Sequence, residues 1–174
     1  MTNLLAILMP AVMAWSSSVY SDTTREYQLK AAYLLNFARF IYWPPEVFSE
    51  KSSNFYICVY GDNPFGESLK HLSNKKIQNK KIKFMDIKNS KGKESCHIVY
   101  ISESEKDDYL KVIDRYSNKT VLIVSDISGF SRSGGMIEFI RIKNKIKFEI
   151  NTKTSGKAGI KYRSQLLKVA NKVR

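Results

Sequence analysis

The amino-acid sequence predicts an α/β fold, in which a mostly parallel sheet is flanked by helices and has a C-terminal β-hairpin at its edge. Short apolar runs typical of buried strands alternate with segments of helical spacing, the order expected of β-α-β units. Near the C-terminus, two alternating apolar and polar runs flank a short polar turn, which indicates a hairpin. The 174 residues suit one domain with a sizeable core, and no repeat or long linker divides them.

The first residues, MTNLLAILMPAVMAW, are mostly apolar and carry no charged side chain. The apolar stretch of residues 4–15 is shorter than the roughly 20 residues that a membrane span needs, and it fits the hydrophobic region of a secretory signal. Cleavage is expected after Ala14 or Ser21. We therefore expect a signal peptide at residues 1–21, a single domain at residues 22–174, and export. A buried N-terminal helix is the alternative interpretation.

The segment after the leader is predicted to be a long helix. Thr23-Thr24-Arg25-Glu26 fits a capping box, in which a hydroxyl caps the first amides and Glu26 reaches back. Trp43-Pro44-Pro45 ends the helix, because proline cannot continue the hydrogen-bond ladder. Apolar residues recur at helical spacing between these signals and form a wide stripe: Leu29, Ala32, Tyr33, Leu34, Phe37, Phe40 and Ile41.

Four strands are expected next, at residues 54–61, 81–87, 96–102 and 120–126, each short and rich in apolar residues. After the first strand, Asn63 caps a short helix and Pro64 takes its first position. After the third strand, Ser102-Glu103-Ser104-Glu105 is a second capping box, predicted to open a helix that runs to about Tyr116.

The paired glycines Gly134-Gly135 raise the question of a phosphate-binding loop. Such a loop leads into a helix N-terminus, where the amides face the anion. Here a strand-like run, residues 136–142, follows the glycines, and a turn at Asn144 leads to a second run, residues 146–150. The glycines therefore enter or bulge an edge strand. Two short helices are expected to finish the chain, one soon after Asn151 and one capped by Ser164.

The chain has two cysteines, Cys58 and Cys96. In an exported protein an even number of cysteines favours a disulfide, which here would close a loop of about 39 residues. Two buried free thiols are the alternative if the chain stays in the cytosol.

The formal net charge is +13, concentrated in residues 70–93 and 141–174. A basic surface is typical of proteins that bind nucleic acid, anionic lipid or an acidic partner. The excess is mostly lysine, without the arginine forks and interleaved aromatics of nucleic-acid readers, and export removes that ligand. We therefore expect no nucleic acid as a partner; a solvated face without a partner is the alternative.

No catalytic or metal-binding constellation is evident in the sequence. His97 follows Cys96 in a predicted strand, so their side chains point to opposite faces. His71 is expected to be solvated, and no cysteine or histidine pair has zinc-site spacing. Ser125-Asp126 stands at a strand end, where capping is a simpler role than catalysis. We expect no enzyme activity, no cofactor and no metal.

A ligand crevice is still expected where the strands end, because open α/β sheets bind ligands beyond the carboxyl ends of their strands. Phe65 and Phe130 would give apolar walls. Polar groups would come from Asp62, Asn63, Ser102 and Ser125. Ordinary turn and capping roles are the alternative for all six residues.

Several motifs stand in the order seen in YfiR/HmsC-like proteins, and the resemblance spans about residues 25–173. They are LKAAYLLNFARFIYWPPEVF, ICVYGDNPFG, CHIVYIS, TVLIVSDISGFSRSGGMIEF, KIKFEIN and SQLLKVA. The sequence thus resembles this family over nearly all of the chain after the leader.

The resemblance implies a periplasmic protein that represses an inner-membrane diguanylate cyclase by direct binding, lowering cyclic di-GMP and biofilm formation. It also implies a small α/β sandwich, a homodimer and a family disulfide at Cys58 and Cys96. Peripheral contact with anionic membrane and control of another inner-membrane sensor protein are further expectations. The alternative function is a periplasmic small-ligand-binding module that feeds a sensor kinase or a transporter.

Overall fold

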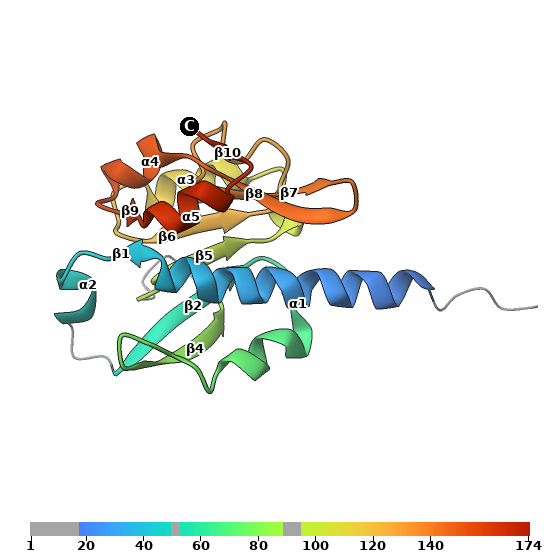
Figure 1. Ribbon diagram of the computed structural model, residues 1–174, viewed down its shortest axis with the longest axis horizontal. Coiled ribbons are helices and arrows are strands. Elements are labelled where there is room, and N and C mark those ends of the chain that lie inside the picture. The colour runs from blue at the N-terminus through green and yellow to red at the C-terminus, as the bar shows by residue number, and fades with distance from the viewer. Residues whose placement is uncertain (1–17, 50–52, 89–94) are drawn as a thin grey trace, which may run out of the picture.

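The computed structural model describes residues 18–49, 53–88 and 95–174 (Figure 1). Of the signal peptide expected at residues 1–21, only residues 18–21 are described, and they form the first turn of helix α1 (Ser18–Arg39). The prediction of a leader therefore falls largely outside the described residues.

In the described residues, eight strands form one mixed sheet that is mostly parallel, as the sequence predicts. Its order is β10-β8-β7-β6-β5-β2-β4-β3. Neighbours from β4 to β7 pair in parallel, whereas β3–β4 and β7–β8 are antiparallel. The strands are β2 (Asn54–Tyr60), β3 (Lys76–Ile77), β4 (Lys80–Asp86), β5 (Ile98–Ile101), β6 (Leu122–Ser125), β7 (Ile137–Ile142), β8 (Lys145–Ile150) and β10 (Lys172–Val173).

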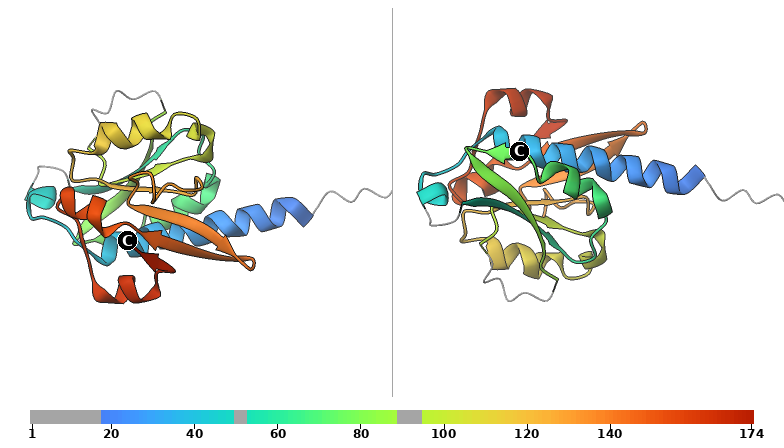
Figure 2. Two further views of the ribbon diagram at one scale, coloured as in Figure 1. Left: turned by 90° about the horizontal axis from the view of Figure 1, so that it is seen from above. Right: turned by 90° about the horizontal axis from the view of Figure 1, so that it is seen from below.

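Helices cover both faces of this sheet, with α1 on one face and α3 (Tyr109–Tyr116) on the other (Figure 2). Every residue of β5 and β6 is buried, as expected for parallel strands that are covered on both sides. Shorter elements complete the chain: β1 (Ile41–Tyr42), which pairs with β9 (Lys161–Tyr162), and the helices α2 (Glu46–Ser49), α4 (Thr152–Lys157), α5 (Ser164–Val169), η1 (Gly66–Leu72) and η2 (Glu103–Glu105).

The predicted hairpin is confirmed as β7 and β8, which form an edge region of the sheet together with β10. Lys143 and Asn144 both have positive φ, as a two-residue hairpin turn that follows the strand twist requires. Gly135 stands before β7, where a Cβ atom would lie 2.2 Å from the ring of Phe130. Glycine is therefore needed there for close packing, and the glycine pair leads into a strand as predicted.

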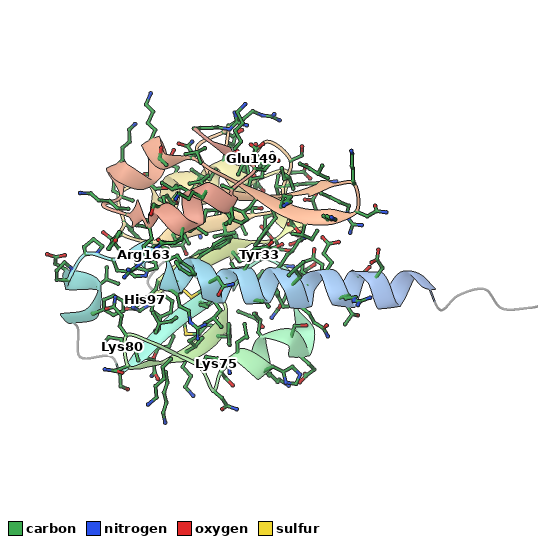
Figure 3. All side chains as sticks on the ribbon, in the orientation of Figure 1. Tyr33, Lys75, Lys80, His97, Glu149 and Arg163 are labelled. Atoms are coloured by element: carbon green, nitrogen blue, oxygen red, sulfur yellow. A yellow bond between two sulfur atoms is a disulfide. The ribbon has the colours of Figure 1, made fainter. Side chains whose placement is uncertain are left out.

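The predicted disulfide is present between Cys58 in β2 and Cys96 just before β5, with 5.9 Å between their Cα atoms. It joins two neighbouring strands of the sheet. His97 lies beside it, buried against the rings of Trp43, Phe48 and Phe55 (Figure 3).

Two predicted helix starts are wrong. The first helix begins at Ser18, so Thr23–Glu26 lies inside α1, where the Thr23 amide is within the helical ladder and Glu26 pairs with Lys30 instead. The box at Ser102 opens only the 3₁₀ turn η2, and α3 starts at Tyr109. The second serine of this box, Ser104, accepts a hydrogen bond from the amide of Asp62 on another loop.

The other short helices differ in detail from the prediction. The helix after Asn63 is the 3₁₀ helix η1, which begins at Gly66 with Phe65 at its cap position. The Asn63 side chain accepts a hydrogen bond from the Phe65 amide, and Asn63 thus lies two residues before the position where a cap would be needed. Asn151 caps α4 through its side chain, as the position of that helix predicts. Ser164 is the first residue of α5 rather than its cap, which is Arg163.

Candidate functional site

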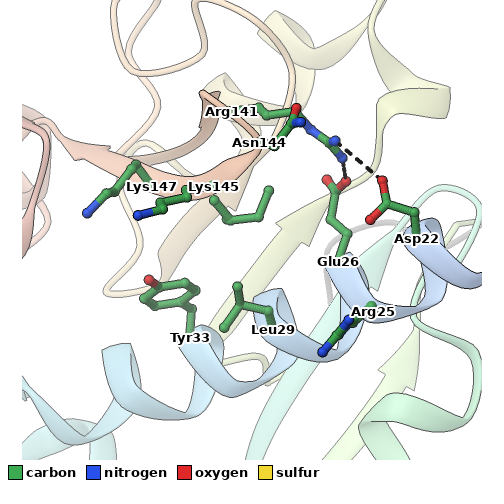
Figure 4. A pocket seen from close by; sticks show the side chains of 10 residues that line it. Asp22, Arg25, Glu26, Leu29, Tyr33, Arg141, Asn144, Lys145 and Lys147 are labelled. Atoms are coloured by element: carbon green, nitrogen blue, oxygen red, sulfur yellow. Dashed lines mark hydrogen bonds and ion pairs between the residues drawn. The ribbon is translucent and has the colours of Figure 1, made fainter.

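A groove of about 610 Å³ lies between α1 and the far half of the β7–β8 hairpin (Figure 4). The hairpin extends beyond the strands that flank it, since β6 pairs only with Ile137 and Glu138 of β7, and β10 only with Glu149 and Ile150 of β8. From α1 the groove is lined by Asp22, Arg25, Glu26, Leu29 and Tyr33. From the hairpin it is lined by Arg141, Asn144, Lys145, Ile146 and Lys147.

The floor of the groove is apolar. Leu29 and Tyr33 point from α1 toward the hairpin, which contributes Ile146 (Figure 4). Tyr33 is held by ring contacts with Phe139 and Phe148, whose centroids lie 5.9 Å and 5.4 Å from its own. Leu29 is 44% exposed, so this floor is open to solvent. The groove therefore offers apolar surface on a rigid support.

The rim of the groove carries acidic and basic side chains, and they differ in whether they pair within the protein. Arg141 bridges from the hairpin to α1, where it pairs with Glu26 and lies 3.7 Å from Asp22. Both acidic side chains of the rim thus already face a cation of the protein itself. Arg25, Lys145 and Lys147 are exposed, and no ion pair with them is found in the described part of the chain. The rim is consequently cationic toward an incoming molecule.

A smaller cavity of about 180 Å³ lies beside the groove and shares Glu26, Arg141 and Ile146 with it. Lys30 is the central group here, with its side chain only 3% exposed. Its Nζ lies 2.6 Å from Glu26 Oε1 and 2.5 Å from Asp126 Oδ2. This ion cluster ties α1 to the loop that follows β6.

Two tyrosines support the ion cluster. The hydroxyl of Tyr27 donates to Asp126 at 3.1 Å, and the Lys30 ammonium lies 4.3 Å from the Tyr27 ring centroid. Burial, together with the charge of Asp126, raises the pKa of Tyr27 well above its usual value. Burial does the same to the pKa of Tyr100 beside it. Both phenols therefore stay protonated, and the Tyr27 hydroxyl serves as a hydrogen-bond donor to Asp126.

The lining of the groove holds charged, amide and apolar side chains, and no histidine, cysteine, serine or threonine is among the residues that form it. Within residues 18–49, 53–88 and 95–174, no cluster of three or more His, Cys, Asp or Glu side chains is arranged to hold a metal ion. Nor does any helix in this part of the chain have the length and hydropathy needed to span a bilayer.

The six residues of the predicted crevice lie at the carboxyl ends of the strands, as expected, but they line neither the groove nor the smaller cavity. Asp62 and Asn63 are at the surface, bonded to Lys88 and Asp86 respectively. The others are buried in packing or hydrogen-bond roles: Phe65, Ser102, Ser125 and Phe130. Their role in binding a ligand stays a prediction.

Sequence reasoning missed Lys30 and the basic residues of the hairpin as site residues. Lys30 interrupts the apolar stripe of the first helix four residues after Glu26, a spacing that predicts an ion pair. Its burial required a second acidic partner, Asp126, which is 96 residues away in the sequence.

The sequence model of one family matches the chain over residues 27–171, from the third turn of the described α1 to just beyond α5. This match confirms the family resemblance that the motifs indicate. The chain belongs to the YfiR/HmsC-like family. YfiR/HmsC-like proteins are periplasmic, and they are regulators of diguanylate cyclase rather than catalysts. No curated protein matches the chain.

Proposed function

We propose that the chain is a periplasmic repressor that binds an inner-membrane diguanylate cyclase directly and lowers cyclic di-GMP and biofilm formation. The observation that carries this proposal is membership of the YfiR/HmsC-like family over residues 27–171. The groove between α1 and the hairpin supports it, because an apolar floor with a charged rim is typical of a surface that binds another molecule.

Repression by binding requires differential affinity. A protein shifts its target toward an inactive state only if it binds that state more tightly than the active one. A difference of about 2.7 kcal/mol in binding free energy shifts the equilibrium about a hundredfold, since 1.36 kcal/mol corresponds to a factor of ten. No covalent chemistry by this chain is needed.

Contact with the anionic membrane beside such a target is part of the proposal. The β3–β4 edge of the sheet carries exposed Lys76, Lys81 and Lys83, and Lys76 lies directly opposite Lys81. Like charges facing each other across strands are destabilising unless an anion lies nearby, and lipid headgroups would supply one. A homodimer, which the family resemblance also implies, would place two such edges on one assembly.

Deleting the gene tests the repressor function. Cyclic di-GMP and surface attachment should both rise, and the rise should disappear when one particular inner-membrane cyclase is deleted as well. Unchanged cyclic di-GMP in the single deletion, in a strain with its cyclases intact, contradicts the proposal.

The second candidate function is a small-ligand-binding module that serves a sensor kinase or transporter. The groove volume of about 610 Å³ favours it, since it is within the range of small-molecule sites. A ligand that binds only the folded protein raises its melting temperature. A thermal-shift screen of periplasmic metabolites that yields a hit, together with unchanged cyclic di-GMP in the deletion strain, would favour this function over repression.

A further inference from the structure

We infer that the groove between α1 and the β7–β8 hairpin is a docking site for an acidic segment that carries apolar side chains. This inference rests on the proposed function in one respect: it assigns the segment to the periplasmic part of the cyclase that the chain controls.

The apolar part of the segment is indicated by the floor. Leu29 is 44% exposed although it lies on the helix face next to buried residues, and Tyr33 and Ile146 continue the same surface. An exposed leucine on a recessed surface gains most when an apolar side chain covers it. The ring contacts of Tyr33 with Phe139 and Phe148 hold this floor in place before binding.

The acidic character of the segment is indicated by the rim. Arg141 pairs with Asp22 and Glu26, the two acidic side chains that line the groove. These two carboxylates therefore do not compete with an incoming carboxylate for the other cations of the rim. Arg25 on α1 and Lys145 and Lys147 on the hairpin are left for the incoming molecule, on a chain whose net charge is already +13. Carboxylates placed between these cations would find complementary charge on both sides.

The shape of the site favours a protein segment over the other occupants. A bilayer surface is flat and does not reach a floor recessed between a helix and a hairpin. A second copy of this chain carries the same excess of positive charge and would meet the rim with like charge. An extended or helical segment can lie between α1 and the hairpin, whose side chains face each other across the groove (Figure 4).

Charge reversal tests the rim. The probe is the purified periplasmic domain of the cyclase whose deletion abolishes the rise in cyclic di-GMP. We expect Lys145→Glu with Lys147→Glu to weaken its binding about tenfold or more and to reduce the salt dependence of binding. The matched control is Lys153→Glu with Lys157→Glu on α4, far from the hairpin tip in Figure 1, which makes the same charge change and should leave binding within about twofold. The inference is overturned if the two double variants weaken binding equally, or if neither of them weakens it.

Site-specific photo-crosslinking in intact cells tests the occupant without assuming the repressor function. A photoreactive residue at Leu29 is compared with one at Leu110, an exposed leucine on α3 outside the groove. The inference is supported if Leu29 alone crosslinks to a protein segment rich in carboxylates with apolar residues, and if the Lys145→Glu, Lys147→Glu pair removes that product. Crosslinks to lipid, to a second copy of the chain, to a small molecule or to a neutral or basic segment overturn it, as do identical products at both positions. If cyclic di-GMP does not respond to the gene deletion, the proposed function fails and the crosslinking result alone decides the groove.

Discussion

The ammonium of Lys30 on α1 lies 2.5 Å from the carboxylate of Asp126, which directly follows strand β6. The lysine side chain is 3% exposed and the aspartate side chain 12%. Glu26 also contacts the ammonium, and together these groups fix the middle of α1 over the sheet and next to the hairpin. It therefore determines where one wall of the groove stands.

Replacing Lys30 by methionine should strongly destabilise the fold. The change leaves Glu26 and Asp126 without their shared cation in a largely buried site, and breaking a buried pair in this way costs about 3–5 kcal/mol. Urea unfolding followed by circular dichroism measures the loss. Adding Asp126→Asn should restore part of the stability, because the neutral amide no longer requires a cation.

The control for this variant is Lys70→Met, which removes a lysine from a pair with Glu67 whose two side chains are about three-quarters exposed. Exposed pairs contribute little, so the urea midpoint should hardly change. Equal effects of the two substitutions would show that the buried cluster has no special role.

Gly135→Ala should destabilise the protein by about 1–3 kcal/mol, because the new methyl group would lie 2.2 Å from the Phe130 ring and force the packing apart. Gly156→Ala in α4 is the matched control: no atom lies within 4 Å of the new methyl group, and alanine favours a helix by about 1 kcal/mol. Thermal unfolding should give a lower melting temperature for the first variant and an equal or higher one for the second. A drop of the same size in both would refute the role of the Phe130 contact.

Reducing the Cys58–Cys96 disulfide should lower the free energy of unfolding by about 4 kcal/mol, the chain-entropy value for a sequence separation of 38 residues. The measurement is urea unfolding with and without a phosphine reductant. A variant with alanine at both positions should match the reduced protein and show no response to the reductant. A wild-type midpoint unaffected by complete reduction would contradict this prediction.

The stability of the fold should depend on pH through His97. Burial lowers the pKa of this imidazole from 6.5 to about 4 in the folded protein, while its Nδ1 accepts a hydrogen bond from the Tyr56 amide. Between these two pH values the unfolded chain binds more protons than the folded one. The free energy of unfolding therefore has its full value above pH 6.5 and decreases, by at most about 3 kcal/mol, as the pH falls to 4.

Urea titrations at several pH values between 7.5 and 4.5 measure this dependence. His97→Asn keeps an acceptor for the Tyr56 amide but does not titrate, so its stability should vary less over that range. A variant with the same pH dependence as the wild type would exclude His97 as its source.

The strands and the hairpin could be predicted well because their signals are local. Alternation of side chains in residues 136–150 and a turn residue with positive φ at Asn144 specify a hairpin without reference to the rest of the chain. Helix starts were less predictable, since Ser, Thr and Glu near a helix end form either a cap or tertiary bonds. Glu26 pairs with Lys30 in the next turn of the same helix and with Arg141 of the hairpin, and Ser104 accepts from the Asp62 amide on another loop.

The groove could be predicted only in part. Leu29 and Tyr33 were recognised as members of the apolar stripe of the first helix, where burial was the expected role. Their exposure in a groove depends on the length by which the hairpin extends past β6 and β10, which no local pattern encodes.

By itself the sequence determined the α/β class, the order of the main elements, the family and the pairing partner of each cysteine, because these depend on local periodicity, motif order and the presence of only two cysteines. The tertiary structure alone decided which charges are buried and which remain for a partner. Lys30 and Asp126 are 96 residues apart in the sequence, and Arg141 and Glu26 are 115 apart. Charges so distant along the chain interact only after the helix has packed on the sheet, since Coulomb attraction depends on separation in space and on burial.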